Sequence, residues 1–282
     1  MQPNQAQALY WSSESGQKWI WFETELDLVF SAVDDALIKR AATQPGERIL
    51  DIGCGTGATT RAFVPRVAPS GKITAVDISP AFVSHARDRA KLTADNTEFV
   101  VADAQSAEIS GAPFDLVISR FGSMFFADPV EAFRNILKQM KPAGRLTIAA
   151  WAKAKGNPWF EAPKSAAVKI LGPLDQSNPN APGPLGFQNV EHVVGILKEA
   201  GFQNVEGETA TVELAHPGPV ERVAALASNI GPAARIIKKY DGSAGDIEAI
   251  TEFVVADFRK FVGSEDIRIP ANLNFFTAQR VG

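Results

Sequence analysis

The chain contains very little cysteine and histidine. Its 282 residues include one cysteine, Cys54, and three widely spaced histidines, His85, His192 and His216. A single cysteine excludes an intrachain disulfide and a cysteine-rich zinc site, and the histidine spacing matches no metal motif. We therefore expect no metal, and we expect the chain to work in a reducing cytoplasm.

Long apolar runs and an excess of positive charge are also missing. No stretch approaches the ~20 apolar residues that cross a bilayer, and the first residues lack the basic and apolar segments of a signal peptide. The chain has 28 Lys and Arg against 32 Asp and Glu, a net charge of -4. Because no global positive field is available, we expect neither a membrane nor a nucleic acid as partner. The 45% hydrophobic content indicates a soluble globular fold.

An alternation of strand and helix patterns occupies residues 47–151. Short apolar runs that predict strands lie at 47–53, 72–78, 97–103, 114–120 and 145–151. Helical spacing follows at 58–68, 80–93 and 129–140. This alternation predicts an α/β fold, a doubly wound Rossmann-like parallel sheet with right-handed crossovers and helices on both faces.

The pattern changes after residue 151. A helix is predicted at 190–201 and strands at 202–214 and 272–281, whereas 153–189 is rich in Gly and Pro and 218–263 has helical spacing. We interpret 153–189 and 215–266 as helical lid insertions. The expected core is then 47–152 with 190–214 and 267–282, preceded by an N-terminal helical segment, 1–46.

Three glycines, Gly53, Gly55 and Gly57, separate the first predicted strand from its helix. Glycine permits positive φ and a close ligand approach, and the free N–H groups of a helix start favour an anionic group. The spacing also satisfies a relaxed dinucleotide pattern, so the glycines alone leave a nicotinamide cofactor open.

Three carboxylates lie at or near the ends of the first three strands. Asp51 would repel a pyrophosphate but attract a ligand that carries an ammonium and a sulfonium. Asp77 can accept both hydroxyls of a ribose. Asp103 can accept an adenine amine while Ala104 offers its backbone N–H. Because open parallel sheets bind ligands beyond their carboxyl ends, we expect all three acids in one crevice.

These segments together resemble the class I S-adenosylmethionine-dependent methyltransferases. The match covers about residues 47–151, through ERILDIGCGTG, ITAVDIS, VVADAQ, FDLVISRFGSMFFADP and KPAGRLTIAAW. The resemblance implies a seven-stranded sheet with an antiparallel last strand and S-adenosyl-L-methionine as cofactor. It places the three glycines around the methionine part, Asp77 at the ribose and Asp103 at the adenine. The segment from NPWF to KEAGF resembles a small-molecule subgroup with a helical cap.

Further candidate site residues follow from their positions relative to the predicted strands. Trp11 and Trp19 precede the first strand, where their rings either stabilise the sulfonium or pack on the sheet. Ser119 and Arg120 end the fourth strand, beside the expected methyl group. The predicted cofactor-binding residues are Trp11, Trp19, Asp51, Gly53, Cys54, Gly55, Thr56, Gly57, Asp77, Ile78, Asp103, Ala104, Ser119 and Arg120.

The expected reaction is an in-line displacement of a methyl group onto a small molecule, which requires alignment and exclusion of water more than acid–base chemistry. No catalytic residue is assigned; His216, Arg120 and Tyr10 are the candidates. One alternative is a cofactor-binding sensor or scaffold without turnover. Another is an NAD-dependent oxidoreductase, which Asp51 and the lack of a Tyr-Lys or His pair disfavour. A homodimer is left open.

Overall fold

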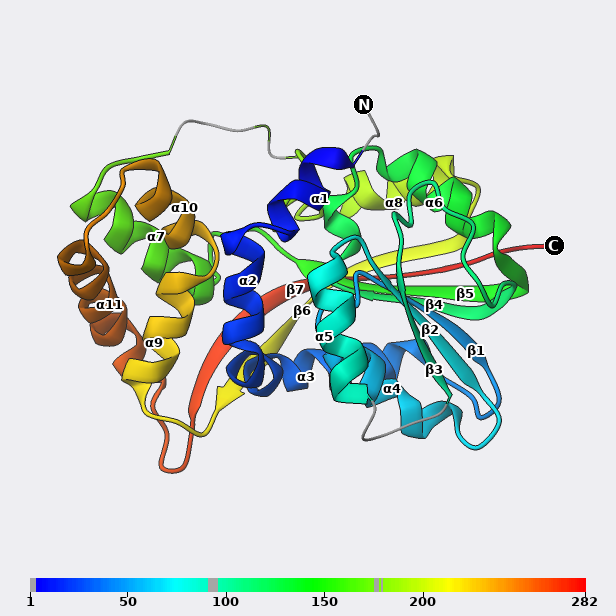
Figure 1. Ribbon diagram of the computed structural model, residues 1–282, viewed down its shortest axis with the longest axis horizontal. Coiled ribbons are helices and arrows are strands. Elements are labelled where there is room, and N and C mark those ends of the chain that lie inside the picture. The colour runs from blue at the N-terminus through cyan, green and yellow to red at the C-terminus, as the bar shows by residue number, and fades with distance from the viewer. Residues whose placement is uncertain (1–3, 91–95, 175–177, 179) are drawn as a thin grey trace.

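A seven-stranded sheet forms the centre of the computed structural model, which describes residues 4–90, 96–174, 178 and 180–282 (Figure 1). The strand order is β3-β2-β1-β4-β5-β7-β6. Neighbours from β3 to β5 are parallel, and β7 is antiparallel to both β5 and β6. The strands are β1 (Arg48–Ile52), β2 (Lys72–Asp77), β3 (Thr97–Val101), β4 (Phe114–Arg120), β5 (Met140–Trp151), β6 (Gln203–His216) and β7 (Ile267–Gln279). The predicted α/β sheet with an antiparallel last strand is confirmed.

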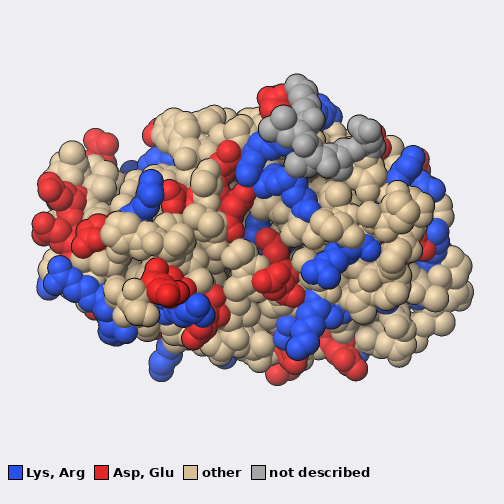
Figure 2. Space-filling model, turned by 90° about the horizontal axis from the view of Figure 1, so that it is seen from below, with Lys and Arg blue, Asp and Glu red and all other residues tan. Residues whose placement is uncertain are grey.

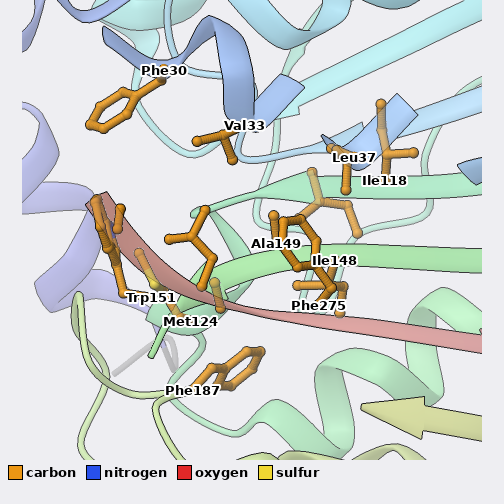
Figure 3. Packing of buried hydrophobic residues seen from close by; sticks show 14 of the residues in the cluster. Phe30, Val33, Leu37, Ile118, Met124, Ile148, Ala149, Trp151, Phe187 and Phe275 are labelled. Atoms are coloured by element: carbon orange, nitrogen blue, oxygen red, sulfur yellow. The ribbon is translucent and has the colours of Figure 1, made fainter. Parts of the chain in front are cut away.

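Helices cover both faces of this sheet (Figure 1). One face carries α3 (Glu23–Ala41), α4 (Ala58–Val67) and α5 (Pro80–Ala90), and the other carries α6 (Pro129–Lys138) and α8 (Val190–Glu199). Buried side chains of α3, such as Val33 and Leu37, lie over strand residues such as Ile118 and Phe275 (Figure 3). The sheet is thereby fixed between two apolar layers, and its carboxyl edge remains available for a site.

A second group of helices lies beyond the carboxyl end of β5 (Figure 1). It comprises α7 (Pro158–Ile170), α9 (Val220–Asn229), α10 (Pro232–Lys239), α11 (Ala244–Phe258) and the 3₁₀ turn η2 (Arg259–Phe261). Helix α11 packs against α7 and α9. Local signals start these helices: proline occupies the first turn of α7 and α10, and Ser243 forms a capping box with Asp246 at α11. These helices fall within the predicted lid insertions.

Two N-terminal helices, α1 (Gln5–Trp11) and α2 (Glu14–Trp21), lie between this helical group and the sheet (Figure 1). Together with α3 they account for the expected helical segment 1–46. Within the described residues, no helix combines the length and the apolar character that crossing a membrane requires.

Several element ends differ from the sequence prediction. Strand β5 begins at Met140 instead of residue 145, because Met140 already pairs with Phe114 before a bulge. Strand β7 begins at Ile267, because the antiparallel ladder with β6 extends to the pair His216 and Ile267. Residues 91–93 of the helix predicted at 80–93 lie outside the described residues.

Candidate active site

One elongated cavity of about 200 Å³ lies beyond the carboxyl ends of β1 to β4. Its wall combines the N-terminal helices, the strand ends and the helical group. The predicted site residues that line it are Tyr10, Trp11, Trp19, Gly53, Cys54, Gly55, Thr56, Asp77, Ile78, Asp103, Ala104 and Arg120. Residues distributed over more than a hundred positions therefore meet in one place, as the strand-end rule predicts.

Gly53 and Gly55 of the turn after β1 serve different purposes. Gly53 has φ +68°, and a Cβ there would lie 2.5 Å from the Cα of Gly122, so glycine permits the close approach of the turns after β1 and β4. Gly55 has φ +54°, and a Cβ there would meet nothing within 4 Å. The backbone at Gly55 therefore faces open space, where a ligand can approach.

Asp77 is held rigidly at the end of β2. Its Oδ2 accepts a hydrogen bond from the Gly55 N–H at 2.9 Å, and its Oδ1 accepts one from the Ser79 N–H at 2.9 Å. Burial raises the pKa of Asp77 to about 6, although these backbone donors oppose the shift. Because a carboxylate has about four acceptor positions, both oxygens can still accept a ligand hydroxyl.

Asp103 connects the sheet edge to the N-terminus. Its Oδ1 accepts hydrogen bonds from the Asn4 side chain at 2.8 Å and the Gln105 N–H at 3.0 Å. The Asn4 oxygen in turn accepts the Ala127 N–H at 2.8 Å. Asn4 lies 99 residues before Asp103, and sequence reasoning missed it because no local pattern marks such a contact.

The Trp11 side chain packs against four aromatic rings and also lines the cavity. Its ring lies 5.0 to 5.8 Å, between ring centroids, from those of Tyr10, Trp19, Phe82 and Phe125. The Ser79 hydroxyl donates to the Trp11 carbonyl at 3.2 Å, which fixes α1 against the turn after β2. The structure thus shows Trp11 packed among aromatic rings on the cavity wall, and its role at the sulfonium stays a prediction.

A cluster of rings forms the other end of the cavity. We call Phe30, Phe121, Trp151, Trp159 and Phe160 the aromatic chamber; all five line the cavity. The Phe121 and Trp151 rings stack at 4.9 Å, and Trp151 meets Phe160 edge-on at 4.7 Å. Phe30 and Trp159 were not among the predicted site residues; the NPWF segment was the signal that could have marked Trp159.

Charged side chains around the chamber are mostly paired. Arg120 donates to Asp34 at 2.9 Å, and Asp34 also accepts the Thr59 hydroxyl at 2.8 Å. Burial raises the pKa of Asp34, while the Arg120 charge opposes this shift. Arg120 thus lines the cavity from a fixed position on β4.

Two acids of the cavity wall, Glu23 and Asp27, are also paired. Glu23 accepts hydrogen bonds from His85 at 2.6 Å and Arg89 at 2.9 Å, and Asp27 accepts from Arg89 at 2.8 Å and Arg61 at 2.9 Å. These contacts connect α3 to α4 and α5. Helix α3 is therefore held against α4 and α5 by ion pairs.

Three predicted cofactor residues, Asp51, Gly57 and Ser119, lie outside the cavity wall. Asp51 is buried under the turn, where it accepts the Thr60 hydroxyl at 2.6 Å, and burial raises its pKa to about 7. Gly57 caps α4 at φ +84°. The Ser119 hydroxyl donates to the Ile52 carbonyl at 2.9 Å. Side-chain alternation along β1 and β4 turns Asp51 and Ser119 away from the cavity that Ile52 and Arg120 line, and Asp51, Gly57 and Ser119 all shape the turn.

His216 and Cys54 lack the surroundings of reactive groups. His216 is buried outside the cavity wall; its Nδ1 accepts the Gly218 N–H at 2.9 Å and its Nε2 bonds Glu25. Both ring nitrogens are thus occupied; this geometry disfavours a general base, and that role of His216 stays a prediction. Cys54 lines the cavity, but burial raises the pKa of its thiol well above the usual value, so the reactive thiolate is disfavoured.

Comparisons with known proteins identify the family of the chain. A family model described as "Methyltransferase domain" matches residues 43–176. The chain is 30% identical over 193 residues to the ubiquinone/menaquinone biosynthesis C-methyltransferase UbiE of Pseudomonas savastanoi pv. phaseolicola, and this match covers 64% of the chain and 75% of that relative. It is 37% identical over 123 residues to the protein of the same name from Ectopseudomonas mendocina, a match that covers 43% of the chain and about half, 48%, of that relative.

Solved structures share the fold. A Haemonchus contortus phosphoethanolamine N-methyltransferase 2, solved with S-adenosylhomocysteine, aligns over 88% of the chain and 52% of its own length with a TM-score of 0.54 and 21% identity. The chain belongs to the family of class I S-adenosylmethionine-dependent methyltransferases, and its cofactor is S-adenosyl-L-methionine. The open space above Gly55 and the carboxylate of Asp77 fit this cofactor.

Proposed function

We propose that the chain transfers the methyl group of S-adenosylmethionine to a small, largely apolar acceptor by in-line displacement. The observation that carries this proposal is the single cavity, which joins the glycine turn to the aromatic chamber. The bound cofactor supplies an activated methyl group on a sulfonium. The protein then has to align acceptor and methyl and to exclude water.

The cofactor assignments follow from the hydrogen bonds already formed. Asp77 accepts the ribose hydroxyls, and Asp103 with the Ala104 N–H binds the adenine. The segment Gly53–Thr56 surrounds the methionine part. Trp11 and Trp19 lie toward the sulfonium, where aromatic faces stabilise a cation by ~0.5 to 2 kcal/mol.

The acceptor assignment follows from the chamber. The stacked and edge-on rings give this part of the cavity wall an apolar aromatic surface, which favours a planar apolar molecule. Relatives named for C-methylation in quinone biosynthesis support a ring acceptor. Arg120 and Tyr10 line the cavity and remain candidates for positioning the acceptor. The helices of 153–189 and 215–266 act as the lid of a core formed by 47–152, 190–214 and 267–282, with 1–46 over the cofactor.

Nucleic acid is a poor acceptor for this surface. On the face shown in Figure 2, Lys and Arg are intermingled with Asp and Glu, and the net charge is -4. A nucleic-acid methyltransferase needs a basic open groove instead. We further propose a cytoplasmic location, because the one cysteine is free and buried.

The test uses S-adenosylmethionine labelled in its methyl group. The chain is incubated separately with the low-mass filtrate, the RNA and the protein fraction of one bacterial extract. We expect label in an apolar compound of the filtrate. Label in RNA or protein would contradict the small-molecule assignment, and tight cofactor binding without label anywhere would support a sensor that lacks turnover.

Hydrogen exchange provides a second measurement. Helices α7, α9, α10 and α11 should gain protection when cofactor and acceptor are both bound, and less with cofactor alone, because the acceptor fills the chamber that they roof. Equal protection in all states would argue against a lid.

A further inference from the structure

Arg235 differs from the other charged side chains of the cavity wall. In the described part of the chain, each of the wall acids Glu23, Asp27, Asp77 and Asp103 accepts a hydrogen bond, and Arg120 donates to Asp34. Arg235 is an exposed residue of α10 that also lines this cavity, and no hydrogen bond or ion pair holds its guanidinium among the described residues. It is a cation on the wall that no neighbouring acid neutralises.

The position of Arg235 places it at the acceptor end. It lies on α10, which belongs to the helical group, and the neighbouring wall residues are Ile230, Gly231 and Pro184. Its Nη2 lies 3.8 Å from where a Cβ on Gly183 would stand, so the guanidinium is beside the loop that precedes Phe187. Helix α10 packs against α7, which carries Trp159 and Phe160 of the aromatic chamber, whereas the glycine turn and the strand-end acids belong to the sheet.

A planar guanidinium with unused donors recognises carboxylate, sulfonate or phosphate groups by paired hydrogen bonds. The aromatic chamber beside it recognises a flat apolar body. We infer that the acceptor is an aromatic or similarly planar molecule that carries an anionic group, and that Arg235 binds this group. The inference rests on the proposed function, since it assigns the acceptor end of that same cavity.

Binding of a matched pair of probes tests this assignment. The pair is 2-naphthoate and 2-naphthamide, which share shape and differ in charge, titrated calorimetrically into protein saturated with S-adenosylhomocysteine. The parent protein should bind the naphthoate at least tenfold more tightly than the amide. In Arg235→Gln this preference should disappear, and Arg235→Lys should retain part of it.

Lys238→Gln is the matched control, because Lys238 is an exposed cation of α10, as Arg235 is, but lies outside the cavity wall. It should leave the preference unchanged. Equal affinity for the two probes, no binding of either, or an unchanged preference in Arg235→Gln would overturn the inference. So would an equal loss of S-adenosylhomocysteine affinity in that variant, since Arg235 would then serve the cofactor. Failure of the parent protein to bind S-adenosylhomocysteine would instead contradict the proposed function.

Discussion

The two ends of the cavity are built by different means. At the cofactor end, strand ends and one glycine turn supply polar groups, and the carboxylates of Asp77 and Asp103 already accept hydrogen bonds from neighbours. At the acceptor end, rings from α3, the turn after β4, the end of β5 and α7 form the wall, and among the described wall residues Arg235 is the charged side chain that no hydrogen bond or ion pair holds. The cofactor end is preorganised by short-range geometry, whereas the acceptor end depends on how distant segments pack.

The cofactor end binds the methyl donor, whereas the acceptor end determines which molecule is methylated. Groups that hold a common cofactor are fixed by the sheet, which α/β proteins share. Of the groups at the acceptor end, Trp159, Phe160 and Arg235 lie on helices inserted after β5 and β6, whose length and sequence can change without altering the sheet. Variants at the cofactor end should therefore affect S-adenosylmethionine binding, and variants at the acceptor end should affect acceptor binding alone.

The largest effect is expected for Asp77→Ala. Loss of two charge-assisted hydrogen bonds at ~1.5 to 3 kcal/mol each should weaken S-adenosylhomocysteine binding at least about a hundredfold. Calorimetry measures the affinity. Asp115→Asn is the control, because Asp115 bonds Lys141 and the Arg48 N–H at the amino end of β4, away from the cavity. If Asp77→Ala weakened S-adenosylhomocysteine binding less than about threefold, the assignment of Asp77 to the ribose would be wrong.

The next effect is a pH dependence of cofactor affinity. With a pKa of about 6, Asp77 is mostly protonated at pH 5 and cannot accept both ribose hydroxyls. Affinity for S-adenosylhomocysteine should thus be about tenfold lower at pH 5 than at pH 7. Asp77→Asn should show a flat profile over this range.

The free protein provides an independent check of the same pKa shifts. Asp51 and Asp77 have folded-state pKa values of about 7 and about 6, above the ordinary 3.8, so the folded state binds more protons between these limits. The free energy of unfolding should therefore fall as pH rises from about 4 to about 7. A rise over this interval in denaturant titrations would contradict the buried placement of these acids.

The sequence predicted the cofactor end better than the acceptor end. Asp77 and Asp103 could be placed because a strand ends beside each acid, and parallel strands end at one edge. Asp51 lies outside the cavity wall, because alternation along β1 turns its side chain toward Thr60 under the turn. Phe30 and Arg235 could not be placed, because their arrival at the cavity depends on the packing of α3 and α10, which no local pattern encodes.

A smaller effect is expected for Trp11→Ala. The sulfonium of S-adenosylmethionine gains from an aromatic face, and the neutral sulfur of S-adenosylhomocysteine does not, so the variant should lose about threefold more affinity for the former, ~0.7 kcal/mol. Paired calorimetric titrations compare the two ligands. Trp21→Ala is the control, since Trp21 is 65% exposed and outside the cavity wall. If Trp11→Ala lost the same affinity for both ligands, Trp11 would contribute packing and no interaction with the sulfonium.

The smallest effect on turnover is expected for His216→Gln. The Gly218 N–H and Glu25 occupy both ring nitrogens, and Arg222 also bonds Glu25 at 3.0 Å, so the histidine connects the end of β6 to α3 and takes no proton from an acceptor. Turnover should change less than about threefold, while the free energy of unfolding falls by ~1 to 2 kcal/mol with the lost hydrogen bonds. Steady-state kinetics and denaturant titration measure the two quantities. A loss of turnover of about a thousandfold in folded protein would instead make His216 a general base, and the acceptor end would then need acid–base chemistry that its apolar walls do not otherwise supply.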